Sequence, residues 1–519
     1  METFKQKLLN YYKFSEDDFL KFSKPLEEIE LKNPNKIKGI IEAKEIVFEA
    51  IQNKEKIIIY GDYDCDGISA TSIMVKTFQK LDYPASYYIP SRYIDGYGLN
   101  VKNVIAIAEN GYKLIITVDN GICQHEAILE AKKRGIKVIV VDHHELPSSP
   151  VNADVILHPI YSGISNIVAS GGYMSLFLSA SLLGHYDDYL VTLAGLSVVS
   201  DLMSLEDYNR DVVRLAIDNL EKHQYLPLQL LIDNEIITEK TFSLDIAPKI
   251  NAIGRMIEDK NVNLLVKYLT SKNSEDVYQL RDWIIHNNEA RKELTKEVVD
   301  NLNLDLSKEP GIVLKLDIKE GLIGLIANRL LNQYNVPSVV FTTDEKDPNI
   351  LKGSIRSKEG FNVIKAFDSL TKYIVNGGGH ALAGGLAIKK ENFDNFKKDF
   401  IVLCDKYRIL EEKKETIEIS ISDINMENYE LLRKFAPFGM GNVEPTLLIK
   451  DLPTRGLDFI SGGKHLSTQL SINSKILGFN MSSNEIKSHS TINLYGNFNL
   501  SIFRNYKTLE FRVNKYLLQ

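Results

Sequence analysis

Cysteine is scarce in this chain of 519 residues, which has only Cys65, Cys123 and Cys404. The three thiols are odd in number and far apart, and no CxxC pair or Cys/His cluster accompanies them. This pattern excludes a disulfide framework and a zinc site built on thiolates. We therefore expect three reduced thiols, as in a cytoplasmic protein.

Long apolar segments are also missing. The first residues carry acids and lysines throughout, without the uninterrupted apolar region of a secretory signal. The most apolar stretch, residues 168–199, is interrupted by His185, Asp187 and Asp188. A membrane-spanning helix needs about 20 consecutive apolar residues, so this stretch is interpreted as buried helices. The chain is expected to be cytoplasmic, with no membrane partner.

The chain has no excess of positive charge. Its 62 Lys and Arg against 69 Asp and Glu give a formal net charge of −7, which argues against nucleic-acid binding over the whole surface. The charge is uneven, however, because residues 431–519 hold eleven Lys or Arg against five Asp or Glu. This local balance of +6 could follow a phosphate backbone, but on charge alone a solvated surface explains it better.

What is present is an ordinary globular composition, 44% hydrophobic and 25% charged, at a length that suggests three or four domains. Three apolar, β-branched runs at residues 57–60, 114–118 and 137–141 each lead to an aspartate, with helical stretches at 70–81 and 125–134 between them. This order predicts an α/β domain with a parallel sheet. All three aspartate clusters should then lie beyond the carboxyl ends of the strands.

Three further regions follow this domain. Apolar residues at helical spacing between Val277 and Leu302 predict a long connector helix. A second, smaller α/β domain is predicted next, because strand-like runs at residues 311–318 and 337–343 lie on either side of a helical stretch at 322–334. Short alternating strands near the C-terminus predict a small β-barrel or a sandwich. The first three predicted parts are an N-terminal helical segment at residues 1–50, the first α/β domain at 51–270 and the connector at 271–308. The last two are the smaller α/β domain at 309–410 and the barrel at 411–519.

Asp62, Asp64 and Asp66 alternate in the sequence GDYDCDG after the first predicted strand. Carboxylates crowded at one strand end repel each other unless a cation neutralises them, so a divalent metal site is one interpretation. An EF-hand calcium loop is excluded, because no glutamate stands at its final ligand position and a strand precedes the motif. The alternative is that these aspartates only cap the following helix.

Two further clusters supply similar ligands: Asp119 in VDNG, and Asp142, His143 and His144 in VDHHE. Asp201 follows a fourth apolar run. Imidazole combined with carboxylates suits Mn²⁺ or a related ion, whereas an all-oxygen set suits Mg²⁺ or Ca²⁺. Together these side chains could bind two ions that share one aspartate, which is the arrangement of two-metal phosphoester hydrolysis.

The four motifs GDYDCDG, VDNG, VDHHE and the aspartate of VVSD resemble, in content and order, those of the DHH phosphoesterases. Nearly the whole chain is similar to the RecJ branch of that family, the single-strand-specific exonucleases. Residues 246–256 resemble its phosphate-contacting segment, and residues 353–362 and 377–385 resemble its DHH-associated domain. Residues 436–445 resemble the start of its OB-fold, the barrel expected at the C-terminus.

The resemblance implies two Mn²⁺ or Mg²⁺ ions, with Asp119 as the bridging ligand. The implied metal ligands are Asp64, Asp66, Asp119, His143 and Asp201. Asp62 would complete or replace a ligand of the first ion, because many relatives have histidine where this chain has Tyr60, and a phenol is a poor ligand for a hard metal.

Two catalytic residues are implied beside the metal ligands. Asp142 would orient an imidazole, and His144 would contact the scissile phosphate or assist proton transfer.

The resemblance also implies a set of substrate-phosphate contacts: Asn251, Arg255, Ser354, Arg356, Ser357, Gly378, Gly379 and His380. A planar guanidinium suits bidentate phosphate contact, and a glycine-rich backbone lets N–H groups approach an anion. Without the resemblance, a surface salt bridge and an ordinary glycine turn would explain these residues. Lys319 stands where relatives usually have histidine.

The function implied by the resemblance is metal-dependent hydrolysis of single-stranded DNA from the 5′ end, in DNA repair and recombination. One alternative is a DHH phosphodiesterase for short oligoribonucleotides or cyclic dinucleotides, which would not need the barrel. Another is a catalytically inactive replication scaffold, which would have no reason to keep crowded carboxylates. A monomer is expected, with a helicase or a single-strand-binding protein as candidate partners. One or two barrel aromatics should stack on bases, from Phe459, Tyr495, Phe498, Phe503 and Tyr506.

Overall fold

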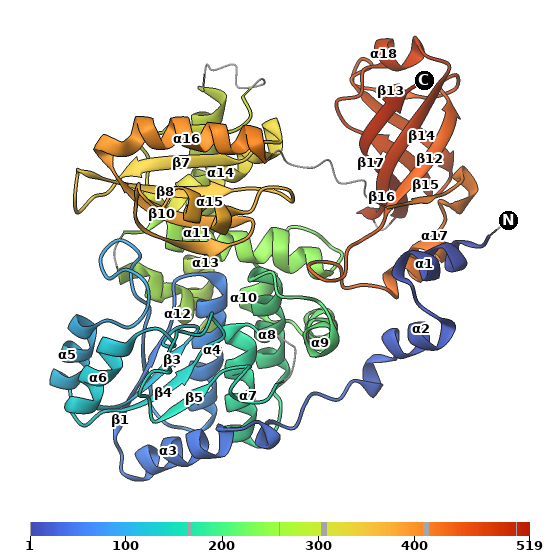
Figure 1. Ribbon diagram of the computed structural model, residues 1–519. Coiled ribbons are helices and arrows are strands. Elements are labelled where there is room, and N and C mark those ends of the chain that lie inside the picture. Colours follow the sequence, from blue (N-terminus) through green and yellow to red (C-terminus); the bar gives the residue numbers. More distant parts are fainter. Residues whose placement is uncertain (1, 165–168, 259, 303–308, 408–414, 505) are drawn as a thin grey trace. The chain divides into compact units, whose positions relative to one another are not determined.

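The structure is a computed structural model that describes residues 2–164, 169–258, 260–302, 309–407, 415–504 and 506–519. The chain forms two compact units. Unit one contains residues 1–89, 98–247 and 414–519, and unit two contains residues 90–97 and 248–413. Each unit has its own sheet structure and apolar core (Figure 1).

A parallel sheet forms the first part of unit one, with the strand order β2-β1-β3-β4-β5. Its strands are β1 (Lys56–Tyr60), β2 (Ser86–Tyr88), β3 (Tyr112–Val118), β4 (Lys137–Val141) and β5 (Val155–Leu157). The central strands are almost wholly buried, because helices cover both faces of the sheet. This confirms the predicted parallel sheet and its three strands that lead to aspartates.

The helices of this part begin with α3 (Ile40–Gln52), α4 (Cys65–Lys80), α5 (Val101–Glu109) and α6 (His125–Lys133). They continue with α7 (Gly171–Leu183), α8 (Asp188–Ser200), α9 (Asp207–Lys222) and α10 (Leu226–Gln229). Helices α7 and α8 are buried along nearly their whole length, as expected for the most apolar stretch of the sequence. Among the helices of the described residues, none is long and apolar enough to cross a membrane.

The C-terminal part of unit one is a seven-stranded sheet with the order β11-β12-β16-β17-β15-β14-β13. Its strands are β11 (Thr416–Glu418), β12 (Thr446–Pro453), β13 (Phe459–Ile460), β14 (His465–Ser471), β15 (Ser474–Gly478), β16 (Thr491–Phe503) and β17 (Tyr506–Leu518). Two helices accompany the sheet, α17 (Met426–Arg433) and α18 (Ser483–Lys487). Along β14, buried residues alternate with more exposed ones, which reflects one face packed inward and one facing water.

Two N-terminal helices belong to the same core as this C-terminal sheet. They are α1 (Phe4–Tyr12) and α2 (Glu16–Phe22). Phe4, Leu8 and Phe19 are buried in one cluster with barrel residues that include Phe498 and Phe511. Helix α3, in contrast, contacts α7 and β5 of the parallel-sheet part. The segment predicted as residues 1–50 is thus divided between two parts of the unit.

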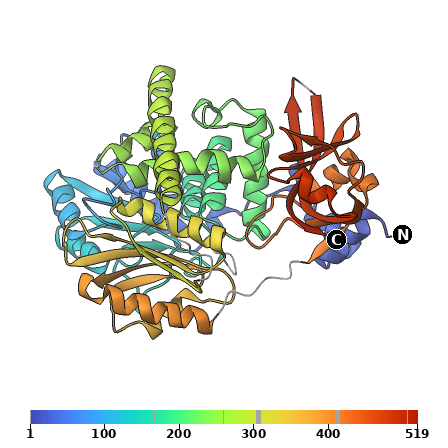
Figure 2. The ribbon, with the colours of Figure 1, turned by 90° about the horizontal axis from the view of Figure 1, so that it is seen from above.

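Unit two contains a mixed sheet with the order β6-β7-β8-β10-β9. Its strands are β6 (Ile312–Lys315), β7 (Ser338–Thr343), β8 (Ile350–Arg356), β9 (Ile374–His380) and β10 (Ala383–Lys389). Its helices are α11 (Ala247–Met256), α12 (Leu264–Thr270), α13 (Ser274–Asp300), α14 (Glu320–Tyr334), α15 (Val363–Ser369) and α16 (Phe393–Lys406). Helix α13 is the predicted connector, and Figure 2 shows it as one long helix. Residues 303–308 and 408–414, where two predicted domain boundaries fall, lie outside the described residues.

Candidate metal centre

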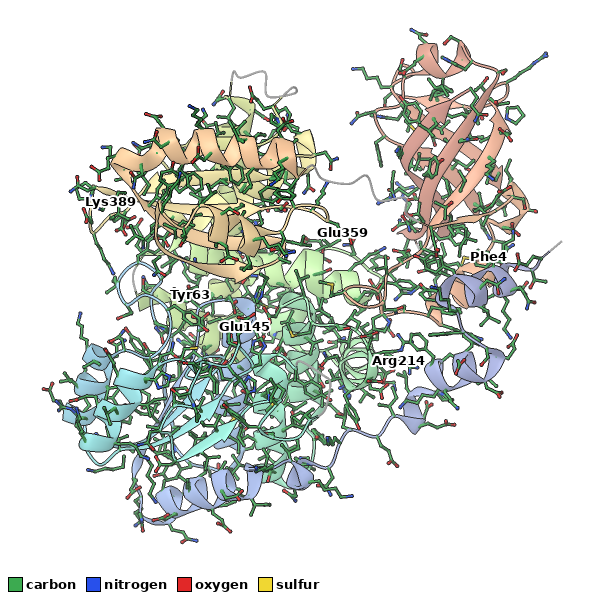
Figure 3. All side chains as sticks on the ribbon, viewed as in Figure 1. Phe4, Tyr63, Glu145, Arg214, Glu359 and Lys389 are labelled. Carbon is green, nitrogen blue, oxygen red and sulfur yellow. The ribbon has the colours of Figure 1, made fainter. Side chains whose placement is uncertain are left out.

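The acidic and imidazole residues predicted as ligands gather at one edge of the parallel sheet. Asp62 and Asp64 follow β1, Asp119 follows β3, and the segment 142–144 follows β4. Parallel strands end at the same edge, so their loops meet there. Figure 3 labels Tyr63 and Glu145, which come from the first and last of these loops. Asp66 lies in the first turn of α4, and Asp201 is the residue that ends α8.

His143 lies within a few ångströms of three of these carboxylates. Its Nε2 atom is 3.1 Å from Asp119, 3.5 Å from Asp66 and 3.5 Å from Asp201. Candidate ligand atoms lie within 4.8 Å of one another in three groups: Asp119, His143 and His144; Asp66, His143 and Asp201; and Asp62, Asp64 and Asp119. Asp119 therefore connects the histidine side of the cluster to the Asp62 side, where the sequence predicts a bridging ligand.

Charge in the cluster is unbalanced without a cation. Burial, followed by repulsion from Asp66 and Asp64, raises the pKa of Asp119 well above its usual range. The same causes raise the pKa of Asp201 to about 8. Carboxylates arranged in this way retain protons or require a positive ion. An oxygen-rich donor set with one imidazole fits a divalent ion such as Mn²⁺.

The backbone at Asp119 takes an uncommon conformation. Its φ is 60°, in the left-handed region that residues other than glycine rarely adopt. The Asp119 N–H donates to the carbonyl of Val141 at 2.9 Å, which ties the end of β3 to β4. Unfavourable backbone geometry of this kind is concentrated at functional sites, where surrounding contacts hold it in place.

Asp142 holds His144 in one orientation. The Asp142 Oδ1 atom lies 2.8 Å from His144 Nδ1, and the other carboxylate oxygen accepts the N–H of Ile122 at 2.9 Å. Burial acts to lower the pKa of His144, but its bond to Asp142 and the nearby carboxylates raise that pKa to about 9. In His143, burial dominates and lowers the pKa. At neutral pH the two neighbouring imidazoles therefore differ, because His144 is cationic and His143 is neutral.

Residues that sequence reasoning missed hold Asp66. The two oxygens of Asp66 accept the N–H groups of Gly171 and Gly172, at 2.8 and 2.7 Å, at the first turn of α7. The Ser197 hydroxyl donates to the same carboxylate at 2.5 Å, and Ser170 contacts Ser197. A helix N-terminus favours a negative charge. In the sequence, the two glycines after Ser170 indicate a capped helix start. They do not predict which carboxylate accepts the N–H groups at that helix end.

His158 is a second residue that sequence reasoning missed. It is buried, and its Nε2 lies 2.9 Å from the carbonyl of His144. Its Nδ1 accepts the N–H of Ile160 at 3.3 Å, so Nε2 carries the proton and donates to His144. His158 thereby supports the loop that carries His143 and His144.

Asp64 combines the two interpretations left open by its motif. Its side chain accepts the N–H of Gly67 at 3.0 Å and caps α4. It also belongs to the group of potential ligands with Asp62 and Asp119. A carboxylate has two oxygens, so capping a helix with one leaves lone pairs for a cation.

Tyr60 lies in the apolar core between the sheet and α5. Its ring is buried and is tilted against that of Tyr88. Its hydroxyl donates to the carbonyl of Gly98 at 3.3 Å and accepts from Asn103 at 2.8 Å. The phenol is thereby used in packing β1 against the segment that begins α5.

The predicted phosphate contacts all lie in unit two, and three of them come from β8 and its end. Arg356 Nη1 donates to the Ser354 hydroxyl at 2.9 Å, and burial lowers the pKa of Arg356. Ser357 is buried, and its N–H donates to the carbonyl of Leu382 at 2.8 Å.

The glycine-rich segment forms a strand, so it is not the ordinary glycine turn that was the alternative explanation. Gly378 pairs with Gly385, and His380 pairs with Ala383, in the edge strand β9. All three of the predicted residues Gly378, Gly379 and His380 are exposed. Because Gly385 also pairs with Ser354 of β8, the glycines leave an open surface beside that serine.

Asn251 and Arg255 lie on α11. Arg255 Nη1 donates to the carbonyl of Gly321, at the start of α14, at 3.3 Å. Lys319, the residue before α14, donates to Glu258 and to the carbonyl of Met256. Lys319 thus joins the end of α11 to the start of α14.

The barrel aromatics differ in exposure. Tyr506 has 78% of its surface exposed, whereas Phe498 is buried and Phe459 and Tyr495 are half-buried. The side chain of Phe503 lies outside the described residues.

Three family models match the chain in succession. The DHH family, N-terminal domain, matches residues 56–226, the DHHA1 domain matches residues 308–405, and the RecJ OB domain matches residues 416–515. Together these matches make most of the chain similar to the RecJ branch of the DHH family. This confirms the resemblance of the four motifs, and it assigns the seven-stranded sheet to an OB domain.

Several proteins similar to this chain carry the name single-stranded-DNA-specific exonuclease RecJ. The Bacillus subtilis protein is 32% identical over 438 residues, which are 81% of this chain and 55% of that protein. The Haemophilus influenzae protein is 28% identical over 452 residues, which are 80% of this chain and 78% of that protein. The chain therefore spans little more than half of the first relative and over three-quarters of the second.

Solved RecJ structures have the same fold. The structure of RecJ from Thermus thermophilus in complex with Mn²⁺ superposes with a TM-score of 0.84 and covers 99% of this chain and 76% of that one, at 21% identity. A structure of exonuclease RecJ bound to manganese has a TM-score of 0.61 and 25% identity, and covers 72% of this chain and 95% of that one.

Proposed function

We propose that this chain is a metal-dependent exonuclease that hydrolyses single-stranded DNA. The observation that carries the proposal is the cluster around Asp119, in which buried carboxylates and the His143 imidazole lie close enough to bind two ions. An OB domain on the same chain supports a long single strand as the substrate, since such barrels combine cationic grooves with aromatic stacking.

Two sets of side chains are proposed to hold Mn²⁺ or Mg²⁺. Asp62, Asp64 and Asp119 form one set, and Asp66, His143 and Asp201 form the other, with Asp119 shared. When bound, such ions supply an activated water and neutralise charge on the departing oxygen. Relatives whose structures hold manganese support this choice of metal.

The chain's own residues are proposed to move the proton and orient the phosphate. Asp142 keeps His144 cationic at neutral pH, so His144 can contact a phosphate oxygen and donate the proton of Nε2 to the leaving group. His158 holds the same loop through the His144 carbonyl.

Binding of the substrate backbone is proposed for unit two. Arg356 and Ser354 already form a joined guanidinium and hydroxyl pair beside the exposed glycines of β9. The other phosphate contacts stay predictions: Asn251, Arg255, Ser357, Gly378, Gly379 and His380. Several further properties also stay predictions: cleavage from the 5′ end, the role in repair and recombination, the cytoplasmic location, the monomeric state, and a helicase or single-strand-binding protein as partner.

The proposal is tested with end-labelled single-stranded DNA, RNA and duplex DNA, each with Mn²⁺, Mg²⁺ or a chelator. Mononucleotides should be released from single-stranded DNA with either metal, and the chelator should stop their release. His143→Ala should reduce turnover at least about 100-fold, since metal-site partners carry effects of this size. His185→Ala, an exposed histidine outside the cluster, is the matched control. Cleavage of dinucleotides alone would contradict the proposal and favour a small-substrate phosphodiesterase.

A further inference from the structure

Asp201 is the most exposed carboxylate around His143. Its side chain is 32% exposed, compared with 1% for Asp66 and 3% for Asp119. Asp201 is also the only one of these three that comes from the end of a helix, α8, rather than from a strand-end loop or the start of a helix. Its position at the cluster therefore depends on the turn that ends α8.

That turn is held in an unfavourable backbone conformation. The N–H of Leu202 donates to Val199, and that of Met203 donates to Val198, which is the pattern of a Schellman helix end. The position after the cap usually holds glycine in such a turn, yet here Leu202 has a φ of 55°. A leucine in this conformation persists only when surrounding contacts hold the turn.

A loop of the OB domain supplies such contacts. The N–H of Leu205 donates to the carbonyl of Met440 at 2.7 Å. Leu205 is buried, and a Cβ added at Gly439 would lie 2.8 Å from its Cδ1 atom. Gly441 has a φ of 75°, and any side chain there would collide with Ser204. The loop backbone thus lies directly against the residues that follow Asp201.

The loop itself is closed and anchored. The buried amide of Asn442 donates to the carbonyls of Phe435 and Pro437, at 2.8 and 2.7 Å. Gly439 and Asn442 also exchange backbone hydrogen bonds. Arg210 on α9 donates to the Phe435 carbonyl at 3.2 Å, so the helix that follows the turn contacts the loop as well.

We propose that residues 435–442 form a positioning element for Asp201, which holds the turn at the end of α8 and thereby the carboxylate in the metal cluster. Asn442 is the positioning residue, because its amide holds the loop closed through the carbonyls of Phe435 and Pro437. The other ligands are held independently, as the N–H groups of α7 hold Asp66. This inference rests on the proposed metal site, and it makes the OB domain part of that site's support in addition to any role in gripping DNA.

The first test is a Mn²⁺ titration of the full-length chain by calorimetry. Asn442→Ala should weaken binding of one ion about 10-fold, the size expected when a residue supporting a metal ligand is lost, and leave the other ion unchanged. The matched control is Asn493→Ala, which removes a buried barrel amide that accepts the N–H of Asp451. Equal Mn²⁺ affinities for wild type, Asn442→Ala and Asn493→Ala would overturn the inference while leaving the proposed function standing. Absence of Mn²⁺ binding by the wild type would instead overturn the proposed function.

A double-mutant cycle separates positioning from general destabilisation. In the Asp201→Asn background, Asn442→Ala should produce no further loss of Mn²⁺ affinity, because the two residues act through one ligand. Additive losses would contradict the inference. In the metal-free protein, hydrogen exchange of the Leu205 amide should accelerate in Asn442→Ala and not in Asn493→Ala. If Asn442→Ala does not fold, Gly441→Ala tests the same contact from an exposed position and should give the same loss.

Discussion

At the scale of single residues, Asp119 combines burial, an uncommon backbone conformation and the repulsion of neighbouring carboxylates. Each of these costs folding free energy in the absence of a cation. A carboxylate kept under such conditions is explained by binding, since stability alone would favour a neutral residue. At the candidate metal centre, folding stability is therefore reduced by residues that are suited to binding a cation.

Asp119→Asn should stabilise the metal-free protein and abolish hydrolysis. The raised pKa means that the folded state holds a proton that the unfolded state releases above about pH 4, so wild-type stability falls as pH rises from there. The asparagine variant lacks this loss, and its advantage should grow from pH 5 to pH 8, to on the order of 1 kcal/mol. Chemical denaturation in a chelator measures the difference, and Mn²⁺ should stabilise only the wild type. The charge argument would be contradicted if the stability of Asp119→Asn relative to wild type decreased between pH 5 and pH 8.

At the scale of single elements, the start of α7 shows how a buried helix contributes to the site. Two backbone N–H groups at this end have no partner within the helix and donate to Asp66 instead. The glycine pair is needed there, because a Cβ at Gly171 would lie 2.6 Å from the Cβ of Asp119, and one at Gly172 would meet Ser197.

Gly171→Ala should weaken metal binding more than it lowers stability. The added methyl group displaces Asp119 or the N-terminus of α7, so Mn²⁺ affinity should fall about 10-fold or more, while overpacking costs about 1–3 kcal/mol. Gly353→Ala is the control, because its Cβ would collide with Phe341 in the core of unit two. Calorimetric titration and thermal unfolding of both variants measure the two effects. Loss of stability with full Mn²⁺ affinity in Gly171→Ala would refute this account of α7.

The same elements show what periodicity in the sequence can predict. The strands β1, β3 and β4 were predicted because a short β-branched run between charged residues has few alternatives to a buried strand. The glycine run of β9 carries no strand signal, because glycine favours turns locally and its pairing with β10 depends on residues that follow it. Asp201 could be placed after a buried helix, but the turn that aims its carboxylate depends on residues more than 200 positions away.

At the scale of the whole molecule, the N-terminal helices and the OB domain share one core. Phe4 of α1, labelled in Figure 3, lies against Phe498 of β16 with ring centroids 5.9 Å apart. A truncation that removes the barrel alone would therefore expose the apolar faces of α1 and α2. Separating the barrel from the parallel-sheet part therefore requires removal of both ends of the chain.

Phe4→Ala should destabilise the barrel rather than the parallel sheet. Loss of a buried phenylalanine costs about 3–5 kcal/mol through lost burial and the cavity left behind. Hydrogen exchange should accelerate in β12, β16 and β17, with β1, β3 and β4 unchanged. Phe361→Ala, in the core of unit two, serves as the control and should leave the barrel strands protected. Faster exchange confined to the parallel sheet would show that α1 belongs to another core.

Sequence patterns alone predict the parallel sheet, the buried helices, the connector and the acidic motifs, because each depends on residues close together in the chain. The groups that hold the site residues are visible only in the folded chain. Gly171 and Gly172 donate to Asp66, His158 donates to the carbonyl of His144, and the loop 435–442 lies against the turn after Asp201. These contacts join segments far apart in sequence, and a backbone N–H or carbonyl carries no residue-specific signal. Local patterns could therefore predict the ligands but not the groups that position them.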